Sequence, residues 1–239
     1  MKKNKSILIL GASGMVGGEI LKYSLNHPSI QKVYALSRRE LNINPSKLHQ
    51  IIHSDFNDYA PIETILKELD AIYYCIGVYT GKANKEVFYK VTIDFAVNLA
   101  KAVKNVNPNC TFCYLSGAGA DRKEKSRFIF ARTKGIAENQ LMALLSHFYS
   151  FRPNFIYPVT PRKEVNDTYG LTRNIYRLLF YSHSSFSKIR MIQSFTRFTS
   201  ITSQQLAQSM LEVGLNRYSK QILEHKDIHS ICDTFDVSN

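Results

Sequence analysis

The sequence predicts an α/β protein built on a doubly wound parallel sheet, and two observations predict this class. Short apolar segments rich in β-branched residues alternate with longer segments of helical period through the first two thirds of the 239-residue chain. Most of the short segments are nearly continuous apolar runs, which are typical of strands covered on both faces. Alternating strands and helices with short connections indicate a parallel sheet, and right-handed crossovers place helices on both of its faces.

The expected elements follow one another along the chain as strand, helix and strand. The six predicted strands are short apolar runs, at residues 7–10, 33–36, 48–53, 71–76, 111–115 and 148–152. A first helix follows the first strand, with Val16, Ile20 and Leu21 on its apolar face. Two longer helices, at residues 88–106 and 129–145, repeat apolar residues at steps of three and four, which predicts one buried face on each.

The pattern loosens after Pro153, where helices are expected only near residues 171–180 and 204–213. We expect residues 1–155 to form the sheet-based core. Residues 156–239 are expected to form a small C-terminal cap region packed on that core, so that the whole chain is one structural domain.

Composition and charge restrict the class of partner. With 44% hydrophobic and 21% charged residues the chain is typical of a globular protein, which excludes disorder and coiled coil. Its 31 Lys and Arg against 19 Asp and Glu give a net charge of +12, which predicts an anionic partner: nucleic acid, a membrane surface or a phosphorylated small molecule. No run approaches the roughly 20 apolar residues of a membrane span. The four cysteines form no dense pattern, so we expect a reducing compartment and a cytoplasmic protein.

A glycine-rich turn joins the first strand to the first helix. Gly11 allows a tight turn, Gly14 allows the backbone to approach a pyrophosphate, and Gly17 allows the helix to pack on the sheet. Amides at the helix start then face the negative charge. The turn therefore predicts a dinucleotide-binding site, with a merely tight strand–helix turn as the alternative. The cofactor-binding residues expected here are Gly11, Ser13, Gly14, Met15, Val16 and Gly17.

The end of the second strand indicates which dinucleotide is bound. It reads Ser37-Arg38-Arg39, without the acidic residue that NAD-selective sites place there for the ribose 2′-hydroxyl. Two planar guanidiniums suit a 2′-phosphate, so NADP(H) is the predicted cofactor and a solvated loop is the alternative. Asp55 and Phe56, after the third strand, are where the edge and face of an adenine are expected, unless they form a plain turn.

Short motifs along most of the chain carry a resemblance to a known family. They are the glycine spacing of residues 11–17 and the segments 37–39, 75–77, 80–82, 115–121, 134–135, 151–153 and 223–229. The chain resembles the atypical short-chain dehydrogenase/reductases, and within them the Tat-interacting oxidoreductase-like subgroup. The resemblance implies a Rossmann-like core, NADPH binding and a small C-terminal substrate region. Further residues expected along the cofactor lie at later strand ends and on one helix: Cys75, Ile76, Gly77, Leu115, Lys134, Arg152 and Pro153.

The family's chemistry uses a Tyr-x-x-x-Lys pair, and this chain departs from it. The tyrosine acts as general acid or base on the substrate oxygen, and the lysine holds the nicotinamide ribose. Here Phe130 precedes Lys134, and a phenyl ring has no proton to give or take. Ser116 is expected to polarise the substrate oxygen and Lys134 to bind the ribose. Three tyrosines are candidates for a substitute phenol, in this order: Tyr79, Tyr114 and Tyr157.

Two functional hypotheses follow, and a third is weaker. The first is an NADP(H)-dependent oxidoreductase that transfers hydride to or from a small carbonyl, an alcohol or an activated double bond. The second is an NADPH-binding regulatory or scaffold protein without turnover, for which Phe130 argues. The third uses the basic aromatic segment 171–198 to bind RNA or a membrane surface, against which we favour a substrate-lining cap with solvated charges.

Other partners are not indicated by the sequence. The histidines show no metal-ligand spacing. Cys110 and Cys113 match Cys-x-x-Cys, but they lie along a predicted strand, so we expect core residues on opposite faces rather than a shared metal or disulfide. We therefore expect a small-molecule substrate, no metal, no specific nucleic acid and no membrane span. A homodimer is left open.

Overall fold

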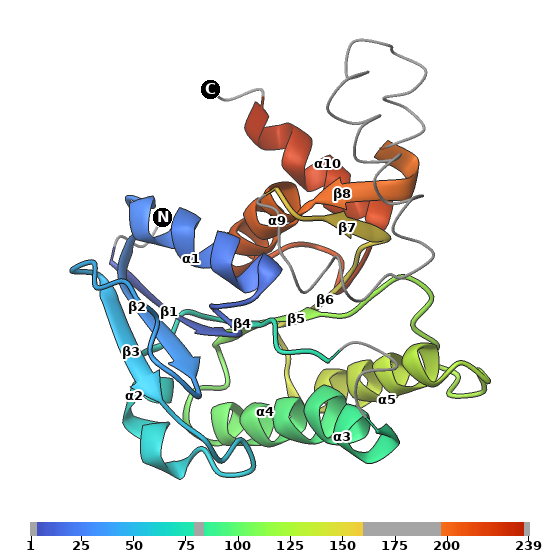
Figure 1. The fold of residues 1–239 in the computed structure, drawn as a ribbon, viewed down its shortest axis with the longest axis horizontal. Coiled ribbons are helices and arrows are strands. Elements are labelled where there is room, and N and C mark those ends of the chain that lie inside the picture. Colours follow the sequence, from blue (N-terminus) through green and yellow to red (C-terminus); the bar gives the residue numbers. More distant parts are fainter. Residues whose placement is uncertain (1–3, 79–83, 160–196, 237–239) are drawn as a thin grey trace.

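A seven-stranded parallel sheet forms the centre of the computed structural model, which describes residues 4–78, 84–159 and 197–236 (Figure 1). The strand order is β3-β2-β1-β4-β5-β6-β9. The chain moves outward from β1 to β3 and then returns to place β4 on the other side of β1, so the connections diverge between β1 and β4. Ligands of open α/β sheets bind beyond the carboxyl ends of the strands at such a point. The strands are β1 (Lys5–Leu10), β2 (Ile30–Ser37), β3 (Leu48–Ile52), β4 (Ala71–Tyr74), β5 (Thr111–Leu115), β6 (Phe148–Arg152) and β9 (Ile222–Glu224).

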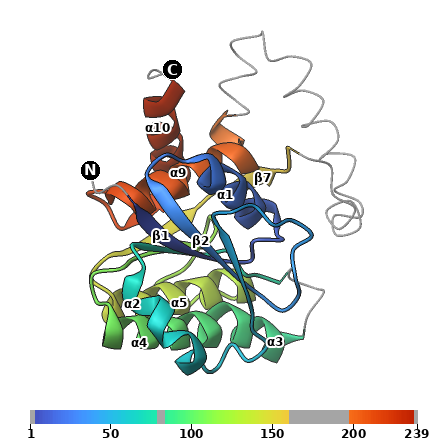
Figure 2. The ribbon, with the colours of Figure 1, turned by 90° about the vertical axis from the view of Figure 1, so that its left-hand side faces the viewer.

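Helices cover both faces of the sheet and bury one apolar core on each (Figures 1 and 2). The helices on one face are α1 (Met15–Asn26), α9 (Ser203–Asn216) and α10 (His225–Asp236). Those on the other face are α2 (Glu63–Glu68), α3 (Lys85–Tyr89), α4 (Phe95–Val106) and α5 (Ile129–Leu144), with the short turns η1 (Ala60–Ile62) and η2 (Lys90–Asp94). The predicted Rossmann-like α/β class is confirmed.

The structure adds short elements to those predicted from the sequence. All six predicted strands are present, and the helix expected near residues 204–213 is α9, which begins with a capping box between Thr202 and Gln205. The three-residue strand β9 at the sheet edge and the helix α10 were not predicted, nor was the separate pair β7 (Phe155–Tyr157) and β8 (Ser200–Thr202). Each of the strands β7, β8 and β9 has three residues, which are too few to show a period.

The C-terminal part of the chain contributes to the central sheet and to its cover. Strand β9 pairs with β6, and α9 packs against α1 and the sheet. The division at residues 155 and 156 into core and cap stays a prediction, and the helix expected at residues 171–180 lies outside the described residues.

The helix predicted over residues 88–106 contains one irregular turn. A π-helical segment, η2 (Lys90–Asp94), separates α3 from α4. Its carbonyls accept hydrogen bonds from tyrosines of the sheet, because Tyr74 donates to Val91 at 2.7 Å and Tyr114 donates to Thr92 at 3.0 Å. Strands β4 and β5 therefore fix the position of this turn through buried hydroxyl groups.

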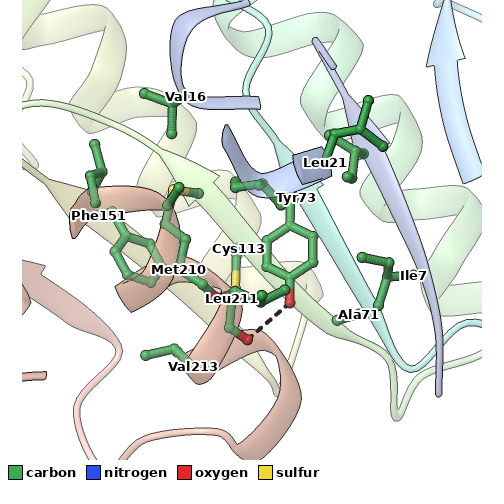
Figure 3. Packing of buried hydrophobic residues seen from close by; sticks show 14 of the residues in the cluster. Ile7, Val16, Leu21, Ala71, Tyr73, Cys113, Phe151, Met210, Leu211 and Val213 are labelled. Carbon is green, nitrogen blue, oxygen red and sulfur yellow. Dashed lines mark hydrogen bonds between the residues drawn. The ribbon is translucent and has the colours of Figure 1, made fainter. Parts of the chain in front are cut away.

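Helix α9 is attached to the sheet by a buried hydroxyl (Figure 3). The fully buried Tyr73 of β4 donates to the carbonyl of Leu211 at 3.1 Å. Gly214 leaves the room for this ring, since a Cβ there would lie 2.2 Å from the Tyr73 oxygen. Cys113 lies in the same core, whereas Cys110 lies in the core of the opposite face, as predicted for two core cysteines.

We expect Tyr73→Phe to lower the free energy of unfolding by about 1 kcal/mol, because a buried carbonyl loses a hydrogen-bond donor. Urea denaturation measures the change. Tyr218→Phe is the matched control, since Tyr218 is 41% exposed and the same change there is expected to be nearly neutral. Equal effects at the two positions would contradict the role of the Tyr73 hydroxyl.

Candidate functional site

The glycine-rich turn has the close contacts that only glycine permits. Gly11 has a φ of +87°, in the region that side chains disfavour, and a Cβ there would lie 2.8 Å from the carbonyl oxygen of Cys75. A Cβ at Gly17 would lie 2.2 Å from the Gly11 oxygen. The start of α1 therefore packs directly on the turn, and the turn packs directly on the end of β4.

The N-terminus of α1 presents its backbone amides to a possible anion. Among the described residues its N-cap, Gly14, forms no side-chain cap hydrogen bond, and its first turn contains no acidic residue. Ser13 is exposed and Met15 is half-buried, whereas the side chain of Val16 is buried in the core. Val16 can therefore offer an anion only its backbone amide, which the helix dipole favours.

The two arginines after β2 are exposed. Ser37 shapes the turn that carries them, because its hydroxyl donates to the carbonyl of Arg39 at 2.5 Å. Within the residues that the structure describes, the side chains of Arg38 and Arg39 have no acidic or hydrogen-bonding partner. Both guanidiniums thus keep all their donors for a ligand.

The structure corrects one expectation for the adenine end. The ring of Phe56 is 5% exposed and stacks on Phe95, with centroids 5.4 Å apart, so its face is not available to a base. Asp55 is exposed and accepts from the amide and side chain of Asn57 at 3.0 and 2.7 Å. These hydrogen bonds hold the pKa of Asp55 below its ordinary value. Asp55 is the one of the pair that remains accessible.

Lys134 on α5 lies against the end of β5. Its Nζ donates to the carbonyl of Leu115 at 2.8 Å and to the hydroxyl of Tyr114 at 3.2 Å. Burial lowers the pKa of Lys134 to about 8. An ammonium has three donors, so one N–H is left for a ribose hydroxyl.

The tyrosines considered as substitute phenols do not fit that role where they are described. Tyr114 is fully buried, with its proton directed to the carbonyl of Thr92, and burial raises its pKa well above the ordinary value. Tyr157 is 2% exposed on β7, and burial raises its pKa as well. Tyr79 lies outside the described residues.

The hydroxyl of Ser116 points into the interior, to a residue that the sequence analysis missed. It donates to Oε1 of Glu138 at 2.7 Å, and Glu138 is fully buried. Ser150 donates to the same oxygen at 2.7 Å, and Nε of Arg152 donates at 2.9 Å. A carboxylate only accepts, so Ser116 has no proton left to polarise a substrate carbonyl. An acidic residue on the apolar face of α5 was the signal that could have revealed Glu138.

Arg152 and Pro153 are held within the protein rather than free at a pocket edge. The guanidinium of Arg152 forms ion pairs with Glu138 and, at 2.9 Å, with Glu224. The carbonyl of Pro153 accepts from the amide of Ala118 at 2.9 Å. Both residues therefore shape the loops after β5 and β6.

The carboxyl ends of β1, β4 and β5 bring the other expected residues together. Cys75 and Ile76 follow β4 beside the Gly11 turn, and Gly77 lies beyond them in open space. Burial raises the pKa of the Cys75 thiol to about 12, so this thiol is not reactive. The carboxyl ends of β1 and β4 therefore present mainly backbone to a ligand, and Lys134 adds an amine at the end of β5.

The histidines of α10 have ordinary structural partners. The rings of His225 and His229 are 4.7 Å apart, and each has its Nε2 at a backbone carbonyl, of Arg197 at 2.9 Å and of Ser200 at 3.1 Å. Within the described part of the chain, no three or more His, Cys, Asp or Glu residues are grouped to hold a metal. Nor does any described helix combine the length and apolar character needed to cross a membrane.

The family follows from a direct match. The model described as "NAD dependent epimerase/dehydratase family" matches residues 7–158, from β1 past β7. The chain belongs to this family. It is 30% identical to rat "Protein HTATIP2" over 161 residues, 64% of each chain. It is also 30% identical to "Protein FMP52, mitochondrial" of Saccharomyces cerevisiae over 149 residues, 61% of this chain and 63% of the relative. The predicted family resemblance is confirmed.

The solved structures show the same fold at low identity. The Bordetella bronchiseptica enzyme WbmG in complex with NAD has a TM-score of 0.64 and 12% identity, with 98% of this chain and 79% of that chain covered. The chain spans about three fifths of the length of the first curated relatives that it matches. The matched family model names NAD in its description, and the comparisons do not distinguish NAD from NADP for this chain.

The expectation of a cytoplasmic protein is contradicted by the relatives. Those named FMP52, from several yeasts, carry the word mitochondrial in their names. Cysteine usage indicates a reducing compartment, and the cytoplasm is one of several such compartments. Net charge bears on solubility and does not identify a compartment.

We expect Glu138→Ala to lower the free energy of unfolding by about 3–5 kcal/mol, because the guanidinium of Arg152 would lose its buried partner. Denaturant titration measures the loss. Glu63→Ala is the matched control, since it breaks only an exposed ion pair with Lys67 and is expected to cost about 0.5 kcal/mol or less. A loss below about 1 kcal/mol for Glu138→Ala would contradict the role of this carboxylate.

Proposed function

We propose that the protein binds NADP(H) along the carboxyl ends of β1, β4 and β5 and is an oxidoreductase of the atypical short-chain type. The observation that carries the proposal is the turn from Gly11 to Gly17, whose close backbone contacts only glycine permits and which leads into a helix start with no acidic residue in its first turn. Family membership supports the dinucleotide, and the exposed Arg38 and Arg39 support the 2′-phosphate form.

In this proposal each part of the chain has one task toward the cofactor. The amides of residues 15–17 hold the pyrophosphate, and Arg38 and Arg39 hold the 2′-phosphate. Asp55 lies near the adenine, and the remaining N–H of Lys134 binds the nicotinamide ribose. When bound, the cofactor supplies hydride for a small carbonyl, alcohol or activated double bond, while the protein orients it and excludes water.

A second candidate function is favoured by one specific observation. The two described hydroxyls at the end of β5, those of Ser116 and Tyr114, both donate within the protein, to Glu138 and to the carbonyl of Thr92. This favours an NADPH-binding regulatory or scaffold protein without turnover. Steady NADPH consumption by the wild-type protein with any small substrate would exclude this candidate.

Substrate, partners and location are also proposals. A small-molecule substrate fits the family, and nothing in the described residues calls for a nucleic acid. A homodimer remains a proposal for solution measurement. We propose a mitochondrial location from the names of the FMP52 relatives.

We expect NADPH at a hundred times its Kd to stabilise the protein by about 2.7 kcal/mol, and NADH at the same concentration to stabilise it less. The variant with Arg38→Ala and Arg39→Ala loses charge-assisted hydrogen bonds to the 2′-phosphate. Its affinity for NADPH should fall by roughly ten- to a hundredfold, with NADH unchanged. Thermal unfolding with each nucleotide measures both effects.

Two comparisons make that titration decisive. Arg217→Ala removes an exposed arginine that donates to the carbonyl of Asn109, before the start of β5 and away from the carboxyl ends of the strands, and should leave both affinities unchanged. Equal stabilisation by NADPH and NADH would contradict the role of Arg38 and Arg39. No stabilisation by either nucleotide would contradict the cofactor site itself.

A further inference from the structure

Gly117, just after β5, faces Phe130 in the first turn of α5. A Cβ at position 117 would lie 2.5 Å from Cζ and 3.1 Å from Cε1 of the Phe130 ring. Non-bonded carbons do not approach that closely, because their optimal separation is about 3.5–4.0 Å. The tip of the ring therefore occupies the space that any side chain at position 117 would need.

This contact shows that position 117, directly after β5, faces the side chain of residue 130. Phe130 stands where the family has its catalytic tyrosine, and Cζ is the atom that carries a tyrosine's hydroxyl oxygen. Position 117 points at that atom. Ser116 does not, because its hydroxyl donates to the fully buried Glu138 at 2.7 Å.

Two hydroxyls that bind one substrate oxygen must lie close to each other. At ordinary O–H···O distances of about 2.7 Å each, they are at most about 5.5 Å apart. A side chain at position 117 would lie within this distance of the side chain of residue 130, but residue 117 is glycine in this protein. Neither position carries a hydroxyl here, because residue 130 is phenylalanine and residue 117 is glycine.

We propose that Gly117 and Phe130 form a matched pair that determines the specificity of the site. The pair places carbon where the two hydroxyls would stand, so neither residue 117 nor residue 130 offers a donor to an oxygen that gains negative charge. Among the substrate classes of the proposed function, the pair thereby disfavours simple aldehydes and ketones. The proposal rests on the proposed cofactor site, and it makes residue 117, not Ser116, the partner of residue 130.

Stability provides a test that does not require turnover. Gly117→Ala forces a methyl group against the Phe130 ring, and we expect its melting temperature to fall by about 5 °C. In a Phe130→Ala background the same substitution should lower it by about 1 °C or less, because the space is then open. Equal falls in the two backgrounds would overturn the pairing.

Activity provides the second test, with NADPH and a set of small aldehydes and ketones. Phe130→Tyr restores one hydroxyl, and its partner position remains glycine, so we expect less than a tenfold gain in kcat/KM over wild type. If Ser116 were the partner, the same variant would complete the pair and gain about 10²–10⁴-fold, the usual effect of a placed acid or base. A gain of that size would overturn the proposal.

NADPH-dependent stabilisation of the wild type separates the two claims. If NADPH stabilises the protein and the substitutions at positions 117 and 130 are uncoupled, the matched pair is refuted and the cofactor site stands. If the substitutions are coupled and NADPH does not stabilise the protein, the packing stands, but the proposed role in substrate choice fails with the cofactor site.

Discussion

A buried carboxylate sets the geometry of the candidate site. Glu138 is fully buried on α5, and it is stabilised there by hydroxyl donors from Ser116 and Ser150 and by the guanidinium of Arg152. An uncompensated charge in that position would cost several kcal/mol, so the ends of β5 and β6 must stay against α5. Arg152 extends the connection to Glu224 of β9, which attaches the edge strand to the same centre.

The same constraint positions the functional residues of α5. Phe130, Lys134 and Glu138 are spaced four apart and therefore share one face of the helix. Because Glu138 fixes this face against the end of β5, Lys134 reaches the carbonyl of Leu115 and Phe130 reaches Gly117. The contact also turns the proton of Ser116 inward. One interaction thus accounts for the placement of the amine and for the inward direction of the Ser116 hydroxyl.

The two halves of the site differ in kind. The half around Gly11 keeps the backbone geometry of a dinucleotide site, with close contacts that any side chain would break. The half around Gly117 has exchanged polar groups for packed carbon. A protein with this combination is suited to hold a nicotinamide cofactor and to be selective about what the cofactor reacts with.

Sequence predicted the features that depend on local pattern. The apolar runs gave the six longer strands, and the glycine spacing gave the turn after β1. The strand β9 was not predicted because three residues cannot show alternation. The burial of Phe56 and Tyr114 was not predicted because it depends on aromatic residues that are distant in the sequence. The direction of Ser116 likewise depends on Glu138, which is 22 residues away in the chain.

A crystal structure with NADPH bound tests the central claim most directly. We expect the pyrophosphate at the amides of residues 15–17, the 2′-phosphate on Arg38 and Arg39, and the nicotinamide beside the Phe130 ring and Gly117. We also expect no protein hydroxyl within hydrogen-bond distance of a carbonyl oxygen placed at the reacting carbon. The hydroxyl of Ser116 or of Tyr79 at that place would contradict it.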